Sequence, residues 1–121
     1  YPVKTNKVKV KNRYFNYLIK TDNKKIVIKR REQSDIWKGL YDFPLVESNK
    51  ELDTFEDNIY LDVRLKHILT HQHIYASFWI NECQKIISEE SEIIIELADL
   101  EDYALPQLLV KYLNQSDYFN R

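Results

Sequence analysis

The chain has 121 residues, of which 44% are hydrophobic and 31% are charged, and it holds one cysteine. These values predict one folded domain with its own core and exclude a disordered chain. No apolar run approaches the roughly 20 residues of a membrane-spanning helix, so we expect no membrane partner, and no signal peptide is expected. One cysteine can form neither an internal disulfide nor an iron–sulfur cluster held by this chain alone, which favours a reducing, cytoplasmic location.

The charges are divided unevenly along the chain, although the net charge is only −1. Residues 1–31 hold 11 Lys or Arg and one acid, whereas residues 32–121 hold seven bases and 18 acids. Such asymmetry is typical of a protein with one edge facing a polyanion. A pair of solvated charged strands would give the same pattern, so the charges alone leave both interpretations open.

The N-terminal stretch combines a linker-like start with a row of basic residues. Residues 1–6 are interpreted as the end of an interdomain linker, because the residue before Pro2 avoids the helical region, and we expect the chain to be a piece of a longer protein. From residue 7 to residue 13, basic side chains fall at every second position, which on a strand places them on one face. The row could neutralise phosphates or protect an edge strand from aggregation. Its members are Lys7, Lys9, Lys11 and Arg13.

Alternating and β-branched residues predict two strands, over residues 13–20 and 25–31, joined by the turn-forming residues 21–23. The two strands are expected to pair as a hairpin. The second strand ends in a further basic cluster, which is the other candidate for phosphate contact: Lys29, Arg30 and Arg31.

Gly39 is the only glycine in the chain. A lone glycine marks a backbone position that needs a positive φ or a close approach. Its aromatic neighbours Trp37 and Phe43 are interpreted as buried side chains. A further strand is predicted over residues 43–47, with Pro44 near its start or on a sheet edge.

The remaining elements complete an α+β pattern. A stripe of apolar side chains predicts a helix over residues 48–60. Residues 92–96, EIIIE, predict a strand, and residues 103–114 predict a second helix with Pro106 at its first position. The expected order is β-β-β-α-β-β-β-α, a mixed β-sheet flanked by helices in an α/β/α arrangement. The stripe of the first helix consists of Leu52, Phe55 and Ile59.

The whole chain is organised around residues 64–80, RLKHILTHQHIYASFWI. Residues 64–69 and 73–80 are typical of strands. The joint between them has three hydrogen-bonding side chains, and without a glycine it is not predicted to be a two-residue type I′ hairpin. A polar turn is the simplest interpretation of the joint alone. Its residues are Thr70, His71 and Gln72.

Several kinds of chemistry are excluded by the residues present. One glycine cannot build a Walker loop or a dinucleotide-binding fingerprint, and there is no nucleophile elbow. The histidines and the cysteine lack the paired close spacing of a structural zinc site, so no metal is predicted. The cysteine also has no sequence sign of an activating base. These residues are His67, His71, His73 and Cys83.

Three segments of the chain resemble the C-terminal domain of the adenine DNA glycosylase MutY family. They are residues 1–15, with the basic row; residues 36–44, IWKGLYDFP; and residues 65–71, LKHILTH, which is similar to the family's His-x-Phe-Ser-His segment. The stretch 104–106 before the last helix is also similar. The resemblance implies a Nudix-like fold for a single domain over residues 1–121.

The resemblance also implies a function in base-excision repair. The domain would read 8-oxoguanine paired with adenine in double-stranded DNA, with Leu69, Thr70 and His71 as the lesion-recognition residues. The family's catalytic acid and iron–sulfur cluster lie in an N-terminal helical domain outside this chain. That catalytic domain is therefore an expected partner, while this fragment is expected to hold no cofactor and to be no enzyme by itself.

Two other functions are kept as alternatives. One is a magnesium-dependent Nudix hydrolase of a nucleotide diphosphate, which needs glycines and an Arg-Glu-x-x-Glu-Glu helix; Leu45 and Val46 stand where glycines are required, and residues 48–60 lack the glutamate array. The other is a protein-interaction module that uses the acidic C-terminal half.

Overall fold

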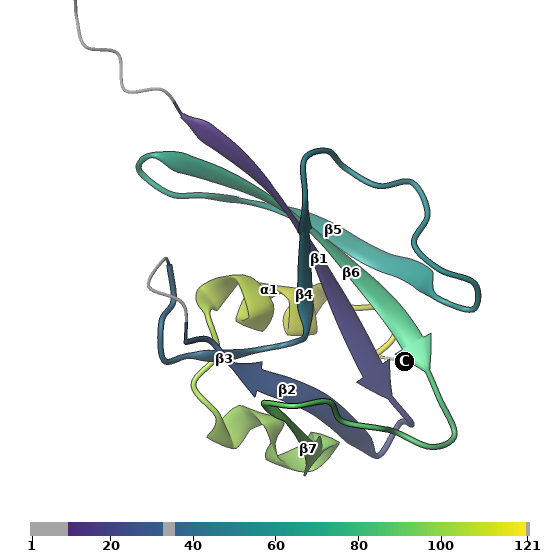
Figure 1. Cartoon of the computed structure of the whole chain (residues 1–121). Helices are drawn as coiled ribbons and strands as arrows, with labels where there is room; N and C mark the ends of the chain where they lie inside the picture. The colour runs from purple at the N-terminus through teal and green to yellow at the C-terminus, as the bar shows by residue number, and fades with distance from the viewer. Residues whose placement is uncertain (1–9, 33–35, 121) are drawn as a thin grey trace, which may run out of the picture.

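The computed structural model describes residues 10–32 and 36–120. Within these residues, seven strands form one mixed sheet, and the short helices η1 (Leu97–Asp102) and α1 (Gln107–Gln115) follow the last strand (Figure 1). No helix among the described residues is long and apolar enough to cross a membrane. The strands are β1 (Lys11–Thr21), β2 (Lys25–Arg30), β3 (Tyr41–Asp42), β4 (Leu45–Ser48), β5 (Tyr60–Ile68), β6 (Gln72–Glu82) and β7 (Glu92–Glu96).

The sheet is centred on β1 and β6. Its main order is β3-β2-β1-β6-β5, and β4 and β7 pair with β1 and β2 respectively. β1 and β6 run parallel from Lys11 opposite Gln72 to Thr21 opposite Glu82, whereas β5 and β6 form an antiparallel hairpin. The mixed sheet confirms the predicted α+β class.

Alternation along the two central strands builds the core. Tyr17 on β1 lies opposite Phe78 on β6, and the two rings stack with centroids 5.2 Å apart. Tyr112 of α1 covers Phe78 at 4.0 Å, with the ring planes 3° apart. Burial of large aromatic side chains supplies much of a domain's stability, so this stack helps to hold α1 on the sheet.

The prediction of a helix over residues 48–60 is wrong. Residues 49–59 form an irregular segment in which Asn58 has a φ of 65°, a conformation that an α-helix does not contain. Phe55 stacks on Trp79 of β6, with ring centroids 5.7 Å apart. The apolar side chains of this segment therefore do pack on the sheet, but they do so from a loop and not from a helix.

The second helix begins later than predicted. Pro106 is its N-cap, with φ −60° and ψ 153°, and Gln107 is the first helical residue. Tyr103, the first residue of the predicted helix, is extended. The short helix η1, which ends just before Tyr103, was not predicted. The observed order is thus seven strands followed by two short helices within the described residues.

The N-terminal half of the sheet follows the predictions with two adjustments. β1 and β2 pair next to their turn, with Thr21 opposite Ile26, and β2 then pairs along its length with β7. The strand predicted over residues 43–47 is interrupted at Pro44, which has no N–H to donate. Gly39 has a φ of 87°, which confirms the predicted need for a positive φ.

Candidate nucleic-acid interface

The loop between β5 and β6 is a tight, backbone-bonded tip. The N–H of Leu69 donates to the carbonyl of Gln72 at 2.8 Å, and the N–H of Gln72 donates back at 3.4 Å. Only Thr70 and His71 lie between this pair, and neither has a positive φ. Because a type I′ turn needs positive φ at both positions, the prediction against such a hairpin is confirmed.

A third strand holds the same tip from the side. The N–H of Lys11, at the start of β1, donates to the carbonyl of His71 at 3.0 Å. Figure 1 shows the β5–β6 tip projecting from the body of the domain beside the first residues of β1. The backbone of the tip is therefore fixed on two sides while its end faces solvent.

The side chains of the tip differ in exposure. Thr70 and His71 are exposed, whereas Leu69 is half-buried and packs against the hydrophobic core. Ile68, the preceding residue, is 64% exposed. Successive strand residues face opposite sides, so Leu69 is turned toward the core and Ile68 away from it. The exposed apolar side chain at the tip is thus Ile68, whereas the sequence predicted Leu69 as the apolar recognition residue.

The predicted basic residues divide into exposed and internal side chains. Lys11, Lys29 and Arg30 are exposed. The guanidinium of Arg13 donates to both carboxylate oxygens of Glu47, at 2.8 and 2.9 Å, and to Gln72 at 3.1 Å. Because Gln72 ends the tip, Arg13 is placed to position the tip. The remaining members of the row, Lys7 and Lys9, lie outside the described residues.

Arg31 is turned into the domain, contrary to its predicted phosphate contact. It is 9% exposed and donates to Asp42 at 3.0 Å and to the carbonyl of Ile36 at 3.1 Å. Burial raises the pKa of Asp42 to about 6, although the hydrogen bond and charge of Arg31 act to lower it. A buried cation already paired with a carboxylate is not available to a phosphate, so we withdraw Arg31 from the contact set.

The structure brings the described parts of all three family-like segments together. Trp37, from residues 36–44, lies 5.7 Å from the ring of His67 on β5 and packs edge-on against Phe15 at 6.2 Å. The Arg31 guanidinium lies 5.9 Å from the Trp37 ring. Burial, with a smaller contribution from Lys111, lowers the pKa of His67. The strand β5, which leads to the tip, therefore packs through His67 against the ring of Trp37, which in turn contacts Phe15.

The histidines and the cysteine do not gather into a metal site. Among the described residues, no group of three or more His, Cys, Asp or Glu side chains is placed to hold a metal ion. His67 packs against Trp37, and the thiol of Cys83 donates to the carbonyl of Asn81 at 3.4 Å.

The mixed sheet and the helices that follow it belong to a known class of domain. The NUDIX domain family model matches residues 16–115, and the chain belongs to that family. Among solved structures, its fold is similar to the C-terminal domain of mouse MUTYH in a complex with human PCNA, with a TM-score of 0.65. That match is 10% identical in sequence and covers 84% of this chain and 85% of the other. No curated protein matches the chain.

These findings confirm the Nudix-like fold expected from the sequence. At 10% identity, the likeness to the mouse domain concerns the fold. The resemblance to MutY C-terminal domains, first carried by short motifs, thus agrees with both the family and the architecture.

Proposed function

We propose that this chain is the lesion-recognition domain of an adenine DNA glycosylase and that it reads 8-oxoguanine paired with adenine in double-stranded DNA. The observation that supports this most is the tip: Thr70 and His71 are exposed, while backbone hydrogen bonds from Leu69, Gln72 and Lys11 hold their main chain. The fold that the chain shares with the MUTYH domain is the second support.

The proposed chemistry rests on one hydrogen position. Guanine offers a lone pair at N7 in the major groove, whereas 8-oxoguanine carries an N–H there and a carbonyl at C8. The Thr70 hydroxyl can accept from that N–H, and His71 supplies a second polar group at the same edge. A well-placed contact of this kind contributes ~1–3 kcal/mol of discrimination. An apolar side chain beside this hydrogen-bonding contact can open the neighbouring base step.

Exposed cations at the start of β1 and on β2 would contact the phosphates. Lys11, Lys29 and Arg30 are the described candidates, and Lys7 and Lys9 extend the row in sequence. Flipping of the adenine and cleavage of its glycosidic bond are assigned to a separate catalytic domain, which would also hold the iron–sulfur cluster. The fragment itself then contributes recognition and no cleavage.

The direct test uses Thr70→Ala and His71→Ala in the longer protein that carries the catalytic domain. We expect both variants to lose preference for 8-oxoguanine:adenine over guanine:adenine duplexes, by roughly 5- to 150-fold for a lost contact of this quality. Thr54→Ala, which removes an exposed hydroxyl from the loop over residues 49–59, is the matched control. An equal loss on both duplexes would contradict the assignment.

Membership of the NUDIX family makes hydrolysis of a nucleotide diphosphate the second candidate. Magnesium in such sites is held by carboxylates at close, near-octahedral geometry, and here Glu51, in the irregular loop, pairs with Arg64 at 3.3 Å. The test is turnover of oxidised dGTP by the 121-residue chain with magnesium. Turnover that a carboxylate substitution in this loop abolishes would replace the recognition proposal.

A further inference from the structure

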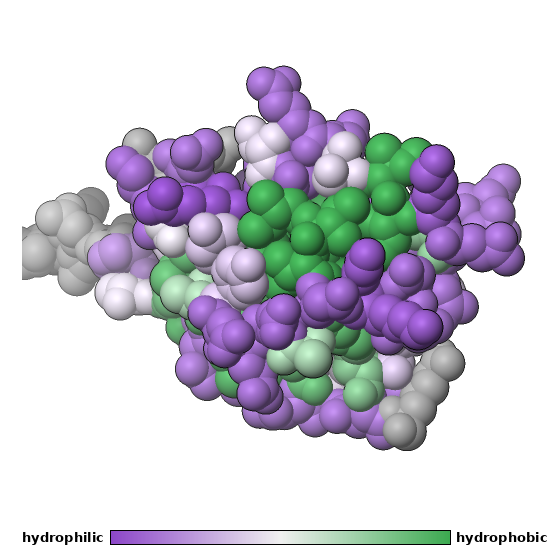
Figure 2. All heavy atoms as spheres, turned by 90° about the horizontal axis from the view of Figure 1, so that it is seen from below, coloured by the Kyte–Doolittle hydropathy of each residue, from purple (hydrophilic) through white to green (hydrophobic). Residues whose placement is uncertain are grey.

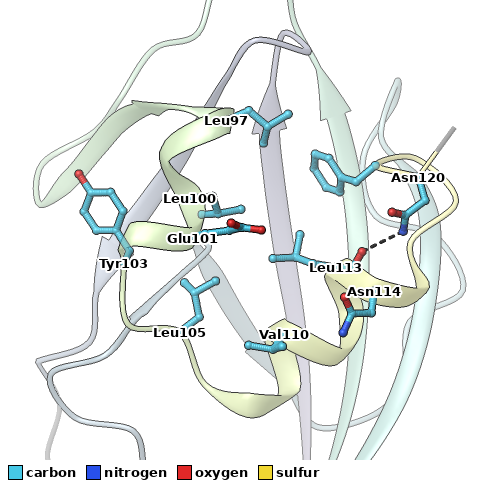
Figure 3. Close-up of a pocket in the computed structure, with 10 residues that line it drawn as sticks. Leu97, Leu100, Glu101, Tyr103, Leu105, Val110, Leu113, Asn114 and Asn120 are labelled. Atoms are coloured by element: carbon cyan, nitrogen blue, oxygen red, sulfur yellow. Dashed lines mark hydrogen bonds between the residues drawn. The ribbon is translucent and has the colours of Figure 1, made fainter.

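An apolar groove lies at the other side of the domain from the tip, between η1 and α1. Its volume is about 610 Å³. Figure 2 shows hydrophobic side chains gathered on the face seen from below, the side on which β7 and η1 lie in Figure 1. Leucine side chains point into the groove from both helices and from the segment between them (Figure 3). The apolar lining includes Leu97, Leu100, Leu105, Val110 and Leu113.

The helix α1 carries more apolar surface than its packing on the sheet requires. Leu108, Leu109 and Tyr112 are buried on the sheet side. Val110 and Leu113, three residues apart, form a second stripe that lines the groove, and Val110 is 38% exposed. An ordinary surface helix presents one apolar stripe to the core and polar residues elsewhere. The second stripe therefore faces a groove that the described part of the chain leaves open.

The segment that forms this groove is acidic. Glu101 lines it and, in Figure 3, extends from η1 into the space between the two helices. Residues 96–120 hold five acids and a single base, Lys111. All five acids are exposed. The segment that forms the groove therefore carries an excess of negative charge, with Glu101 among the lining residues. The five are Glu96, Asp99, Glu101, Asp102 and Asp117.

We propose that the groove between η1 and α1 binds a short amphipathic segment of a partner protein, with apolar side chains on one face flanked by Lys or Arg. Apolar side chains spaced by three or four residues along a helix are the usual way to fill such a groove. Basic flanks follow from charge complementarity with Glu101 and with the other exposed acids of residues 96–120, because such complementarity steers association and selects partners. The groove is separate from the tip, so this proposal does not depend on the proposed lesion recognition.

The test is a titration of the ¹⁵N-labelled chain with two synthetic peptides. Both are about 14 residues long, enough to become helical on binding, and both carry Leu at i, i+3, i+4 and i+7. Lys fills the other positions of one peptide and Glu those of the second. We expect the Lys peptide to shift the amide signals of Leu97, Val110 and Leu113 and to bind at least ~10-fold more tightly than the Glu peptide at low salt.

Two variants and one control locate the site. Val110→Asp should weaken the Lys peptide by ~10-fold or more, because it places a charge on the apolar floor. Ile87→Asp changes a side chain that is 67% exposed between β6 and β7, away from the groove lining, and should have no effect. If Val110→Asp disturbs folding, Glu101→Lys still tests the proposal, because it should weaken binding of the Lys peptide and strengthen binding of the Glu peptide.

Three results would overturn the proposal. Equal affinity for the two peptides would remove the charge argument. Signal changes confined to Lys11 and the tip would place the peptide elsewhere. Shifts of the groove amides that depend on protein concentration without peptide would assign the groove to a second copy of the chain instead.

Discussion

The two ends of the central strands are built on different principles. In the body of the domain, Tyr17, Phe78 and Tyr112 stack in sequence between the sheet and α1, and all three are fully buried. At the tip, Thr70 and His71 are exposed, and the chain there is held by main-chain hydrogen bonds. The residues of the stacked core are thereby separate from those of the proposed recognition site. Substitutions in the body should change folding, and substitutions at the tip should change binding.

The largest expected effect is on the aromatic stack. Tyr112→Ala removes a side chain that contacts both Phe78 and Phe119 and should lower the free energy of unfolding by ~3–5 kcal/mol. Tyr112→Phe keeps the stack and loses only the hydroxyl that donates to Asp62 at 2.7 Å, which should cost about 1–3 kcal/mol. Urea unfolding measures both. Equal losses for the two variants would show that the hydroxyl, and not the ring, fastens α1.

The next effect concerns pH and the buried carboxyl of Asp42. Its pKa is raised from 3.8 to about 6 in the folded protein. The folded state therefore holds a proton that the unfolded state releases in this range, so the stabilisation is complete below pH 3.8 and is lost as the pH rises through 6. The full change is about 3 kcal/mol.

Asp42→Asn isolates this effect from the other carboxylates. The stability of the wild type minus that of the variant should fall by about 2 kcal/mol between pH 4 and pH 7, as measured by urea unfolding at each pH. A difference that rises over the same range would mean that the charge of Arg31 outweighs the burial of Asp42.

Substitutions at the tip, by contrast, should barely change the stability of the domain. Thr70 and His71 are exposed, and substitution to Ala at such positions changes the free energy of unfolding by less than about 0.5 kcal/mol. Thermal melts of Thr70→Ala and His71→Ala, compared with wild type, check this. A loss as large as that of Tyr112→Phe would mean that the tip side chains are part of the fold's support.

The smallest effect is expected from the exposed cations. Lys11→Ala and Lys29→Ala should leave folding unchanged and each reduce the slope of log K against log salt by about 1 in duplex binding. Lys85→Ala, in the loop between β6 and β7, is the control. Slopes that match the wild type would place the DNA on another face.

Much of the sheet could be predicted from local patterns, because a strand's period of two appears directly in the sequence. β1, β2, β7 and the β5–β6 hairpin all lie within a few residues of their predicted bounds. The loop over residues 49–59 was not predictable in this way. Its spacing of Leu52, Phe55 and Ile59 imitates a helix, while its actual partner, Trp79, lies on a strand far along the sequence.

The candidate site shows the same division between local and long-range information. The position of the tip followed from its sequence, but the fate of each basic side chain did not. Arg31 and Asp42 are 11 residues apart, and Arg13 and Glu47 are 34 apart. Only the folded sheet brings each pair together and removes those two arginines from the exposed set. Likewise, the half-burial of Leu69 depends on its contact with the core.

The most direct test of the recognition account removes one hydrogen from the base and one hydroxyl from the protein. Binding of the longer protein is measured for duplexes with adenine opposite 8-oxoguanine or opposite 8-methoxyguanine, which has no N7–H, in wild type and in Thr70→Ala. The account predicts that wild type favours 8-oxoguanine and that Thr70→Ala loses this preference, with a coupling of ~1–3 kcal/mol between residue and base. The same preference in both proteins would contradict it.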